Sequence, residues 1–115
     1  MTAIHILNEI GDERQRQEKL RREGKFLWTC AEPHKDNSQK LAVLAEEFGE
    51  IAKEVTEQII ELDKYRKEML NHPKHRKLAR IAALRKELIQ VAAVCTAWVE
   101  GLDVEEAAIR EMVGE

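Results

Sequence analysis

LAVLAEEFGEIAKEV, at residues 41–55, and IAALRKELIQVAAVC, at residues 81–95, are the two stretches that decide the fold. In each of them, apolar residues recur at intervals of three and four, which is the period of an α-helix with one apolar face. A shift of 40 residues places the apolar positions of the first stretch on those of the second, so that Leu44 falls on Leu84. The two stretches therefore predict two long helices of one design.

The pattern around the first stretch extends the prediction toward the N-terminus. Apolar and charged residues alternate at helical spacing from Ile4 to about Arg22 and predict an amphipathic surface helix that Gly24 can end. Residues 24–37 carry glycine, proline, aspartate and asparagine, which predict an ordered loop around the apolar cluster at residues 26–28. The helix of the first stretch is expected to begin between Asp36 and Ser38 and to run to about residue 70.

The pattern around the second stretch defines the C-terminal half. Pro73 disfavours helix in the residue before it, so it separates the two long helices. We expect the helix after Pro73 to end at a C-terminal cap on Gly101. Asp103 and Glu106 have the spacing of a capping box, which predicts a short last helix through Met112.

Composition is consistent with one all-helical domain over residues 1–115. Apolar residues make up 43% of the 115 residues and charged residues 36%, whereas aromatic residues make up only 4%. We therefore predict an all-α helical bundle with two long central helices. Helices of roughly 30 residues are about 45 Å long, more than a chain of this size can cover. The bundle is expected to be completed by homo-oligomerisation, as a homodimer or homotetramer.

The charge balance restricts the partners. The net charge is −3 and the pI is near 5.9, so nothing draws the whole molecule to a nucleic acid polymer or an acidic membrane surface. No apolar run has the length of a membrane span, and the N-terminus lacks the pattern of a signal peptide, so a cytoplasmic location is expected. Cys30 and Cys95 form no metal-binding pair, and both are interpreted as reduced thiols.

Four polar residues occupy matching positions in the two stretches. In the 40-residue register, Glu47 falls on Glu87 and Glu50 falls on Gln90. Each pair lies on one helix flank at the edge of the apolar stripe, so antiparallel packing can bring three carboxylates and one amide oxygen together. Such oxygen ligands suit Mg²⁺, with Mn²⁺ as a second option. The simpler interpretation is a solvated helix face, but Gly49, costly at mid-helix, favours a packing or ligand-approach role.

These residues also carry a resemblance to a known family. The patterns Glu46-Glu47-x-x-Glu50 and Glu87-x-x-Gln90 resemble the motifs of the MazG-like, all-α nucleoside triphosphate pyrophosphohydrolases. The resemblance implies that Mg²⁺ held by Glu47, Glu50, Glu87 and Gln90 binds a nucleoside triphosphate, which is cleaved between the α and β phosphates into a monophosphate and pyrophosphate. Glu46 is then the candidate catalytic carboxylate for the attacking water.

Gln90 stands where the family has aspartate and brings no charge, so weaker metal binding is expected. A catalytically weak or inactive nucleotide-binding or regulatory protein therefore remains an alternative, and so does a helical structural adaptor. Four cations are candidates for phosphate contacts, although solvated surface charges are the simpler interpretation: Lys53, Lys77, Arg80 and Arg85. Trp98 is expected in the core or at a subunit interface, and so is Trp28, whose loop position gives it a slightly better prospect of ligand contact. His72 and His75 are expected in a solvated loop.

Overall fold

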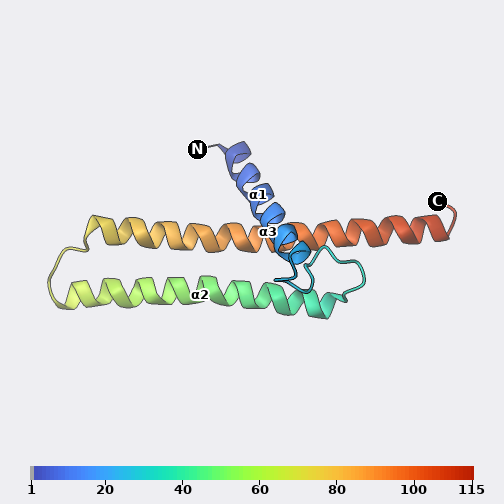
Figure 1. Cartoon of the computed structure of the whole chain (residues 1–115). Coiled ribbons are helices and arrows are strands. Elements are labelled where there is room, and N and C mark those ends of the chain that lie inside the picture. Colours follow the sequence, from blue (N-terminus) through green and yellow to red (C-terminus); the bar gives the residue numbers. More distant parts are fainter. Residues whose placement is uncertain (1) are drawn as a thin grey trace.

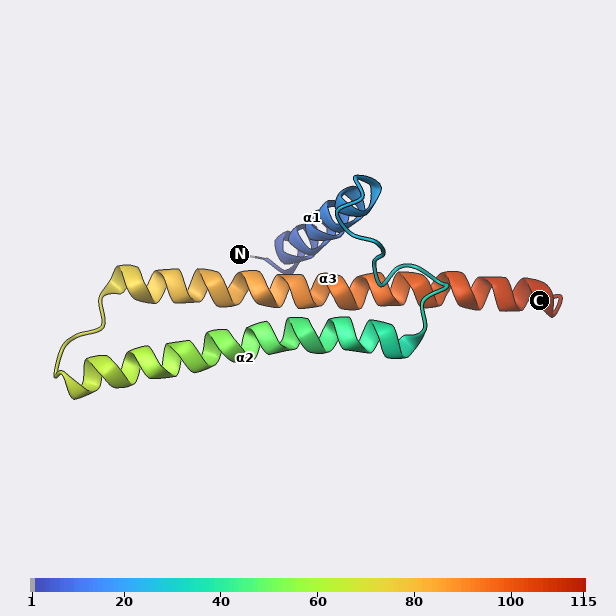
Figure 2. The ribbon, with the colours of Figure 1, turned by 60° about the horizontal axis from the view of Figure 1, so that its bottom comes forward.

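The structure is a computed structural model that describes residues 2–115, and this range holds three α-helices. α1 spans Ala3–Arg22, α2 spans Asn37–Lys67 and α3 spans Lys74–Met112. α2 and α3 form a long antiparallel hairpin, while α1 packs obliquely on α3 (Figure 1, Figure 2). The molecule measures 69 × 30 × 29 Å. The predicted all-helical class with two long central helices is confirmed.

Side-chain caps explain where the first two helices begin. Thr2 precedes α1, and its hydroxyl oxygen accepts a hydrogen bond from the His5 backbone N–H at 3.3 Å. Asp36 precedes α2, and its carboxylate accepts the Gln39 backbone N–H at 2.9 Å. The Gln39 side-chain oxygen accepts the Asp36 N–H at 3.1 Å, which completes a capping box. The predicted start of the second helix between Asp36 and Ser38 is confirmed.

The helix ends agree with the prediction at one position and differ slightly at another. α1 ends at Arg22, and Gly24 follows with a positive φ of 77°, a conformation that glycine adopts without a steric penalty. α2 ends at Lys67, before the predicted end near Leu70, and Met69 has a positive φ of 56°. Pro73 directly precedes α3, as its restriction on the preceding residue predicts.

The predicted break at Gly101 is wrong, because α3 continues through it to Met112. No separate last helix begins at Asp103. Gly101 is buried, and a Cβ atom there would lie 2.8 Å from Lys40 Nζ and 2.9 Å from the Cys30 carbonyl oxygen. The glycine therefore serves close packing against the loop and α2, not helix termination.

The small core lies where the loop of residues 23–36, the start of α2 and the middle of α3 meet. Cys30, Val94 and Ala97 are buried together there. Five half-buried residues pack around them: Trp28, Ala31, Val43, Leu44 and Trp98. The Lys40 side chain is also fully buried at this point. The loop is ordered by this packing, as predicted, and Trp98 has the predicted core position.

Buried polar contacts attach α1 and the loop to α3. Arg14 is buried, and its guanidinium donates to the Glu100 carboxylate at 3.1 Å and to Gln17 at 2.9 Å. It also donates to Glu18 at 2.9 Å, and Glu18 accepts the Thr29 hydroxyl at 2.8 Å. These contacts fix the loop relative to both helices, and the loop in turn forms one wall of the pocket described below.

A second buried network closes the tip of the α2–α3 hairpin. Glu61 is buried and accepts hydrogen bonds from Arg76 and from Arg80, the latter at 3.5 Å. Its carboxylate also lies 2.8 Å from His72 Nε2, and the centroid of the His72 ring lies 4.9 Å from that of the Tyr65 ring, with the two planes tilted by 42°. The expectation of a solvated His72 is wrong, since the Glu61 carboxylate holds the imidazole inside the hairpin; His75 is exposed, as expected.

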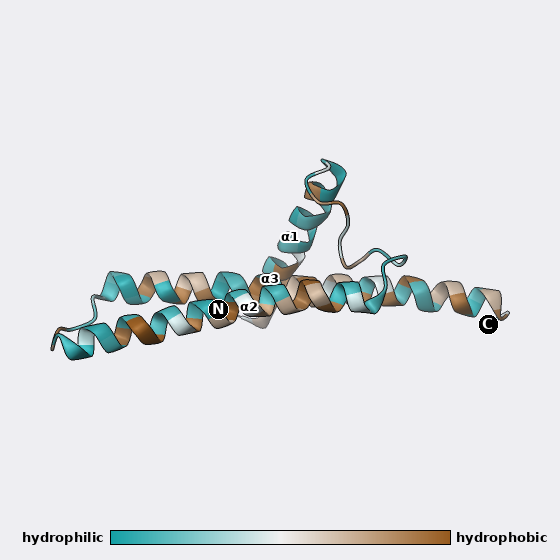
Figure 3. Ribbon diagram, turned by 90° about the horizontal axis from the view of Figure 1, so that it is seen from below, coloured by the Kyte–Doolittle hydropathy of each residue, from teal (hydrophilic) through white to brown (hydrophobic). Residues whose placement is uncertain are grey.

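Hydrophilic and hydrophobic segments alternate along both long helices (Figure 3). This alternation leaves no helix in residues 2–115 with a continuous apolar stretch of the length that a membrane crossing requires.

Candidate functional site

The hairpin brings the predicted acidic residues of α2 close to those of α3. Glu47 on α2 and Glu87 on α3 are both half-buried, and Glu87 is the first of the negative charges that act on Glu47. Gln90, one turn further along α3, is half-buried as well, whereas Glu46 and Glu50 are exposed. The two residues of the matched register thus lie near enough across the hairpin for the charge of Glu87 to act on Glu47.

Electrostatic crowding at Glu47 is the distinctive property of this region. The pKa of the Glu47 carboxyl is raised above its usual value, first by burial and then by the charges of Glu87, Glu46, Glu50 and Glu13. Like charges that share a partly buried site favour protonation of one of them. A cation bound among these carboxylates would relieve the repulsion.

An unsatisfied carboxylate oxygen of Glu87 also favours a bound cation. Glu87 Oε2 is buried and has no hydrogen-bond partner within the described part of the chain. A buried carboxylate oxygen without a partner is costly, since it has lost its hydration without compensation. As the side chains of residues 2–115 stand, no three carboxylate, imidazole or thiolate groups converge closely enough to hold a metal ion. The donor set itself, three carboxylates and the Gln90 amide oxygen, fits a hard divalent cation such as Mg²⁺.

A pocket of about 490 Å³ opens beside the acidic residues. Its walls come from α1, the loop, α2 and α3. Glu46 and Glu47 bring two carboxylates and Gln90 a neutral amide, while Arg16 and Lys25 bring two cations. Phe26 and Trp28 add aromatic surface, and Lys35 Nζ lies 5.3 Å from the Trp28 ring centroid. The pocket thus combines carboxylates, cations and aromatic rings.

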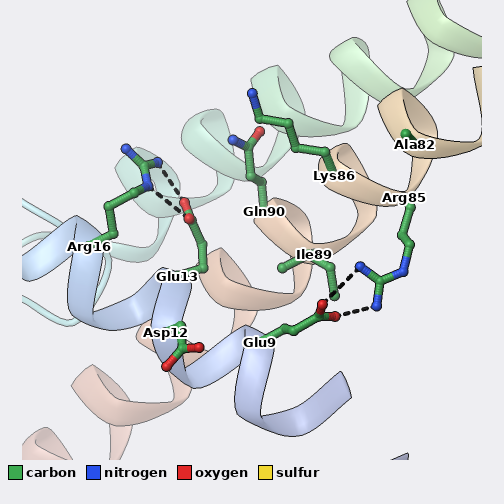
Figure 4. A pocket seen from close by; sticks show the side chains of 9 residues that line it. All are labelled: Glu9, Asp12, Glu13, Arg16, Ala82, Arg85, Lys86, Ile89 and Gln90. Atoms are coloured by element: carbon green, nitrogen blue, oxygen red, sulfur yellow. Dashed lines mark hydrogen bonds and ion pairs between the residues drawn. The ribbon is translucent and has the colours of Figure 1, made fainter. Parts of the chain in front are cut away.

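A second, more open pocket of about 640 Å³ lies where α1 packs on α3 (Figure 4). Gln90 and Lys86 extend from the same side of α3, and the Arg85 guanidinium is held by the Glu9 carboxylate of α1 (Figure 4). Arg16 donates to Glu13 on α1 at 2.8 Å. Three residues line both pockets: Glu13, Arg16 and Gln90. Gln90 therefore lies where the two hollows adjoin.

The four cations that the sequence suggested for phosphate contacts do not line the pocket of about 490 Å³. Arg80 pairs with Glu57 at 3.3 Å and with Glu61, and Arg85 pairs with Glu9, so both serve helix packing. Lys53 and Lys77 are exposed and line neither pocket. Arg16 and Lys25 are the cations that line the pocket of about 490 Å³. Sequence reasoning missed them because they lie on α1 and the loop, where no motif connects them with the acidic residues.

Gly49 does not have the role within the chain that its position suggested. A Cβ atom at this position would meet no atom within 4 Å. Nothing inside the chain therefore requires a glycine there, and the expected packing role is not found among the described residues.

Comparisons with known protein families, with curated proteins and with solved structures gave no match for this chain.

Proposed function

We propose that this chain is a Mg²⁺-dependent nucleoside triphosphate pyrophosphohydrolase that cleaves between the α and β phosphates. The observation that carries the proposal is the buried, unpartnered Glu87 oxygen on α3, on the same hairpin as the half-buried Glu47 carboxylate of α2, on which the charge of Glu87 acts. A chain gains nothing in stability from crowding its own carboxylates, so a bound cation is the simplest reason for the arrangement. The aromatic and cationic walls of the adjoining pocket support a nucleotide as the second ligand.

Each side chain has a role in this proposal. Glu47, Glu50, Glu87 and Gln90 would hold the cation, which when bound would offset phosphate charge and polarise a phosphoryl oxygen. Glu46 lines the same pocket and would orient and deprotonate the attacking water. Arg16 and Lys25 would contact phosphate oxygens, while Phe26 and Trp28 offer surfaces on which a base can stack.

One observation favours a second candidate function. Gln90 contributes an oxygen donor without a charge, so the quartet carries one negative charge fewer than a set with aspartate at this position. A nucleotide-binding or regulatory protein with weak or no turnover would not need the missing negative charge. Binding of a nucleoside triphosphate without pyrophosphate release, and a gain of release in Gln90→Asp, would identify this second function.

The proposal includes assembly of the bundle as a homodimer or homotetramer in the cytoplasm. Within residues 2–115 the buried apolar side chains are few and mostly small: Cys30, Ala93, Val94 and Ala97. So small a core does not compensate for the conformational entropy of ordering helices of 31 and 39 residues. Further apolar burial between copies would supply the missing stabilisation.

The test is a pyrophosphate-release screen with ribo- and deoxyribonucleoside triphosphates, each with Mg²⁺ and with Mn²⁺. We expect release with at least one substrate, loss of release in Glu50→Gln and Glu87→Gln, and faster release in Gln90→Asp. Glu57→Gln is the matched control, because Glu57 lies on the same helix but pairs with Arg80 instead of joining the acidic group. Absence of release from the wild type and from Gln90→Asp across the whole panel would contradict the proposed activity.

The same variants separate an enzyme from a structural adaptor. If the acidic residues only confer solubility, Mg²⁺ would change the melting temperature of the wild type and of Glu47→Gln equally. We expect Mg²⁺ to raise the melting temperature of the wild type alone.

A further inference from the structure

The tip of the α2–α3 hairpin has a charge opposite to that of the rest of the molecule. Residues 64–78, which we call the basic tip, contain one carboxylate, Glu68, and six cations: Lys64, Arg66, Lys67, Lys74, Arg76 and Lys77. The basic tip therefore carries a net charge of +5, and since the whole chain carries −3, the other residues together carry −8. It lies at one end of a molecule 69 Å long, away from α1 and from the C-terminus (Figure 1, Figure 2).

Most cations of the basic tip are not used inside the chain. Arg76 pairs with Glu61, and Lys67 Nζ lies 3.0 Å from the Asp63 carboxylate. The other four are exposed and form no ion pair with any residue in the range 2–115: Lys64, Arg66, Lys74 and Lys77. The last two of these lie in the first turn of α3, where the helix dipole disfavours cations. The stability of the fold therefore does not explain their placement.

Large apolar side chains project from the same tip. Met69 is 92% exposed, Leu78 66% and Leu70 56%. Met69 and Leu70 lie in the short connection between α2 and α3, and Leu78 lies in the second turn of α3. The basic tip is therefore an amphipathic surface, in which exposed apolar side chains lie among cations.

Met69 occupies a backbone position that the other two helices give to glycine. After each helix, the second residue has a positive φ and its N–H bonds back to the last turn: this residue is Gly24 after α1 and Gly114 after α3, both with φ 77°. After α2 it is Met69, with φ 56°. Glycine adopts this conformation without steric cost, whereas a residue with a side chain does not. The chain thus keeps a long, exposed apolar side chain where the fold alone favours glycine.

We propose that the basic tip binds the surface of an anionic lipid bilayer, with its cations at the headgroups and Met69 and Leu70 inserted among the first acyl carbons. Each cation near such a surface strengthens binding about fivefold, and inserted apolar side chains add to it. A nucleic acid would satisfy the same cations but would leave the apolar side chains in water, so the bilayer is the better fit. The expectation that nothing draws the whole molecule to an acidic membrane concerns the summed charge, whereas this contact is local. It is independent of the proposed chemistry.

The length of the hairpin makes this contact compatible with the acidic body of the molecule. Glu47 lies twenty residues before Lys67 on α2, which corresponds to about 30 Å along a helix. Charges in water are largely screened beyond about 8 Å at physiological salt. Neither pocket described above includes a residue of the basic tip. A molecule bound end-on through its tip therefore keeps the carboxylates around Glu47 and both pockets in water.

Co-sedimentation of the full chain with lipid vesicles tests the proposal. Vesicles of phosphatidylcholine mixed with phosphatidylserine should bind the protein, vesicles of phosphatidylcholine alone should not, and rising salt should weaken the binding. Binding to a DNA duplex and to a single-stranded RNA is measured in parallel and should be weaker than binding to the anionic vesicles. No binding to the anionic vesicles, or tighter binding to either nucleic acid, would overturn the proposal.

Charge reversal separates the basic tip from the net charge of the chain. Lys74→Glu combined with Lys77→Glu should weaken vesicle binding by at least about tenfold. This variant should fold, because carboxylates are favourable in the first turn of a helix. The matched control is Lys19→Glu combined with Lys53→Glu, which changes the net charge equally at exposed positions outside the tip and should bind nearly as the wild type does. Equal losses in the two variants would contradict a contact through the tip.

Met69→Gly tests the inserted side chain without endangering the fold. The substitution relieves the strain of the positive φ, so resistance to urea should not fall, while vesicle binding should weaken by about tenfold if the whole side chain leaves water. Met112→Ala is the matched control, because Met112 is 84% exposed at the far end of α3, and it should bind vesicles as the wild type does. Unchanged vesicle binding in Met69→Gly would overturn the inserted contact.

Discussion

Glu47 and Glu61 lie on the same helix, fourteen residues apart, and both approach α3, but they have opposite surroundings. Glu61 is buried among Arg76, His72 and Arg80, and the hydrogen bond from Arg76 first of all lowers the pKa of its carboxyl to about 2. Glu47 is half-buried among other carboxylates, and its pKa is raised. The chain thus neutralises the Glu61 carboxylate with its own cations, whereas the Glu47 carboxylate lies among like charges that repel it.

This difference distinguishes a structural carboxylate from a candidate ligand. At the hairpin tip the Glu61 charge is paired within the chain by Arg76 and His72. At Glu47 the nearby Arg16 donates its hydrogen bonds to Glu13, and the pKa of the Glu47 carboxyl is raised, first by burial and then by the neighbouring negative charges. The unsatisfied region also adjoins the pocket with aromatic walls. The contrast favours an external cation at Glu47 and none at Glu61.

The largest expected effect comes from removing a charge at the unsatisfied region. In Glu47→Gln we expect pyrophosphate release to fall by on the order of 10²–10³-fold, the usual loss when one electrostatic contact to a transition state is removed. The apo protein should not lose stability, because the substitution removes repulsion. Steady-state assays and thermal melting without metal measure both effects. Unchanged release in Glu47→Gln would remove this residue from the proposed site.

Glu61→Gln should lower stability and leave pyrophosphate release nearly unchanged, the reverse of Glu47→Gln. The substitution removes the negative charge that Arg76, Arg80 and His72 share, so we expect a fall of several degrees in melting temperature. Release measured well below the melting temperature should stay close to that of the wild type. A strong loss of release at unchanged stability would show that the comparison assigns the two carboxylates wrongly.

The pH dependence of stability sharpens the contrast. The folded-state pKa of Glu61 is about 2 against a usual value of 4.5, so its contribution to stability is complete above pH 4.5 and is lost as the pH falls toward 2. The difference in melting temperature between wild type and Glu61→Gln should therefore be constant at neutral pH and shrink below pH 4.5. A difference that is independent of pH across this range would contradict the assigned ionisation.

The smallest effect is expected at Gly49, which lies between Glu47 and Glu50. No atom of the chain comes within 4 Å of a Cβ atom built there. Gly49→Ala should therefore stabilise the apo protein by about 1 kcal/mol through helix propensity alone, as measured by urea unfolding. A loss of stability would show that another molecule, such as a second copy, approaches the helix at this point.

The helices were predictable because their signals are local. Apolar periodicity predicted α2 and α3. Asp36 predicted where α2 begins, and Pro73 predicted where α3 begins. Gly101 was misinterpreted because a glycine that ends a helix and one that admits a close neighbour look alike in sequence. Only the fold shows the Lys40 side chain and the loop packed against it.

The candidate site was predictable only in part, for the same reason. The 40-residue register relates Glu47 to Glu87 because the two helices carry one repeat, and the hairpin brings these residues together. The pocket residues Arg16, Lys25 and Phe26 come from α1 and the loop, whose packing on α3 depends on single contacts such as that of Arg14 with Glu100. Contacts between residues so distant in sequence leave no periodic signal. The burial of His72 by Glu61 was missed on the same ground.

The central claim is that the carboxylates around Glu47 and Glu87 hold a divalent cation. Calorimetric titration of the wild type, Glu87→Gln and the control Glu57→Gln with Mn²⁺ tests it most directly. We predict saturable binding to the wild type and to Glu57→Gln, and a loss of binding in Glu87→Gln. Equal binding to all three proteins, or none to the wild type, would contradict the claim.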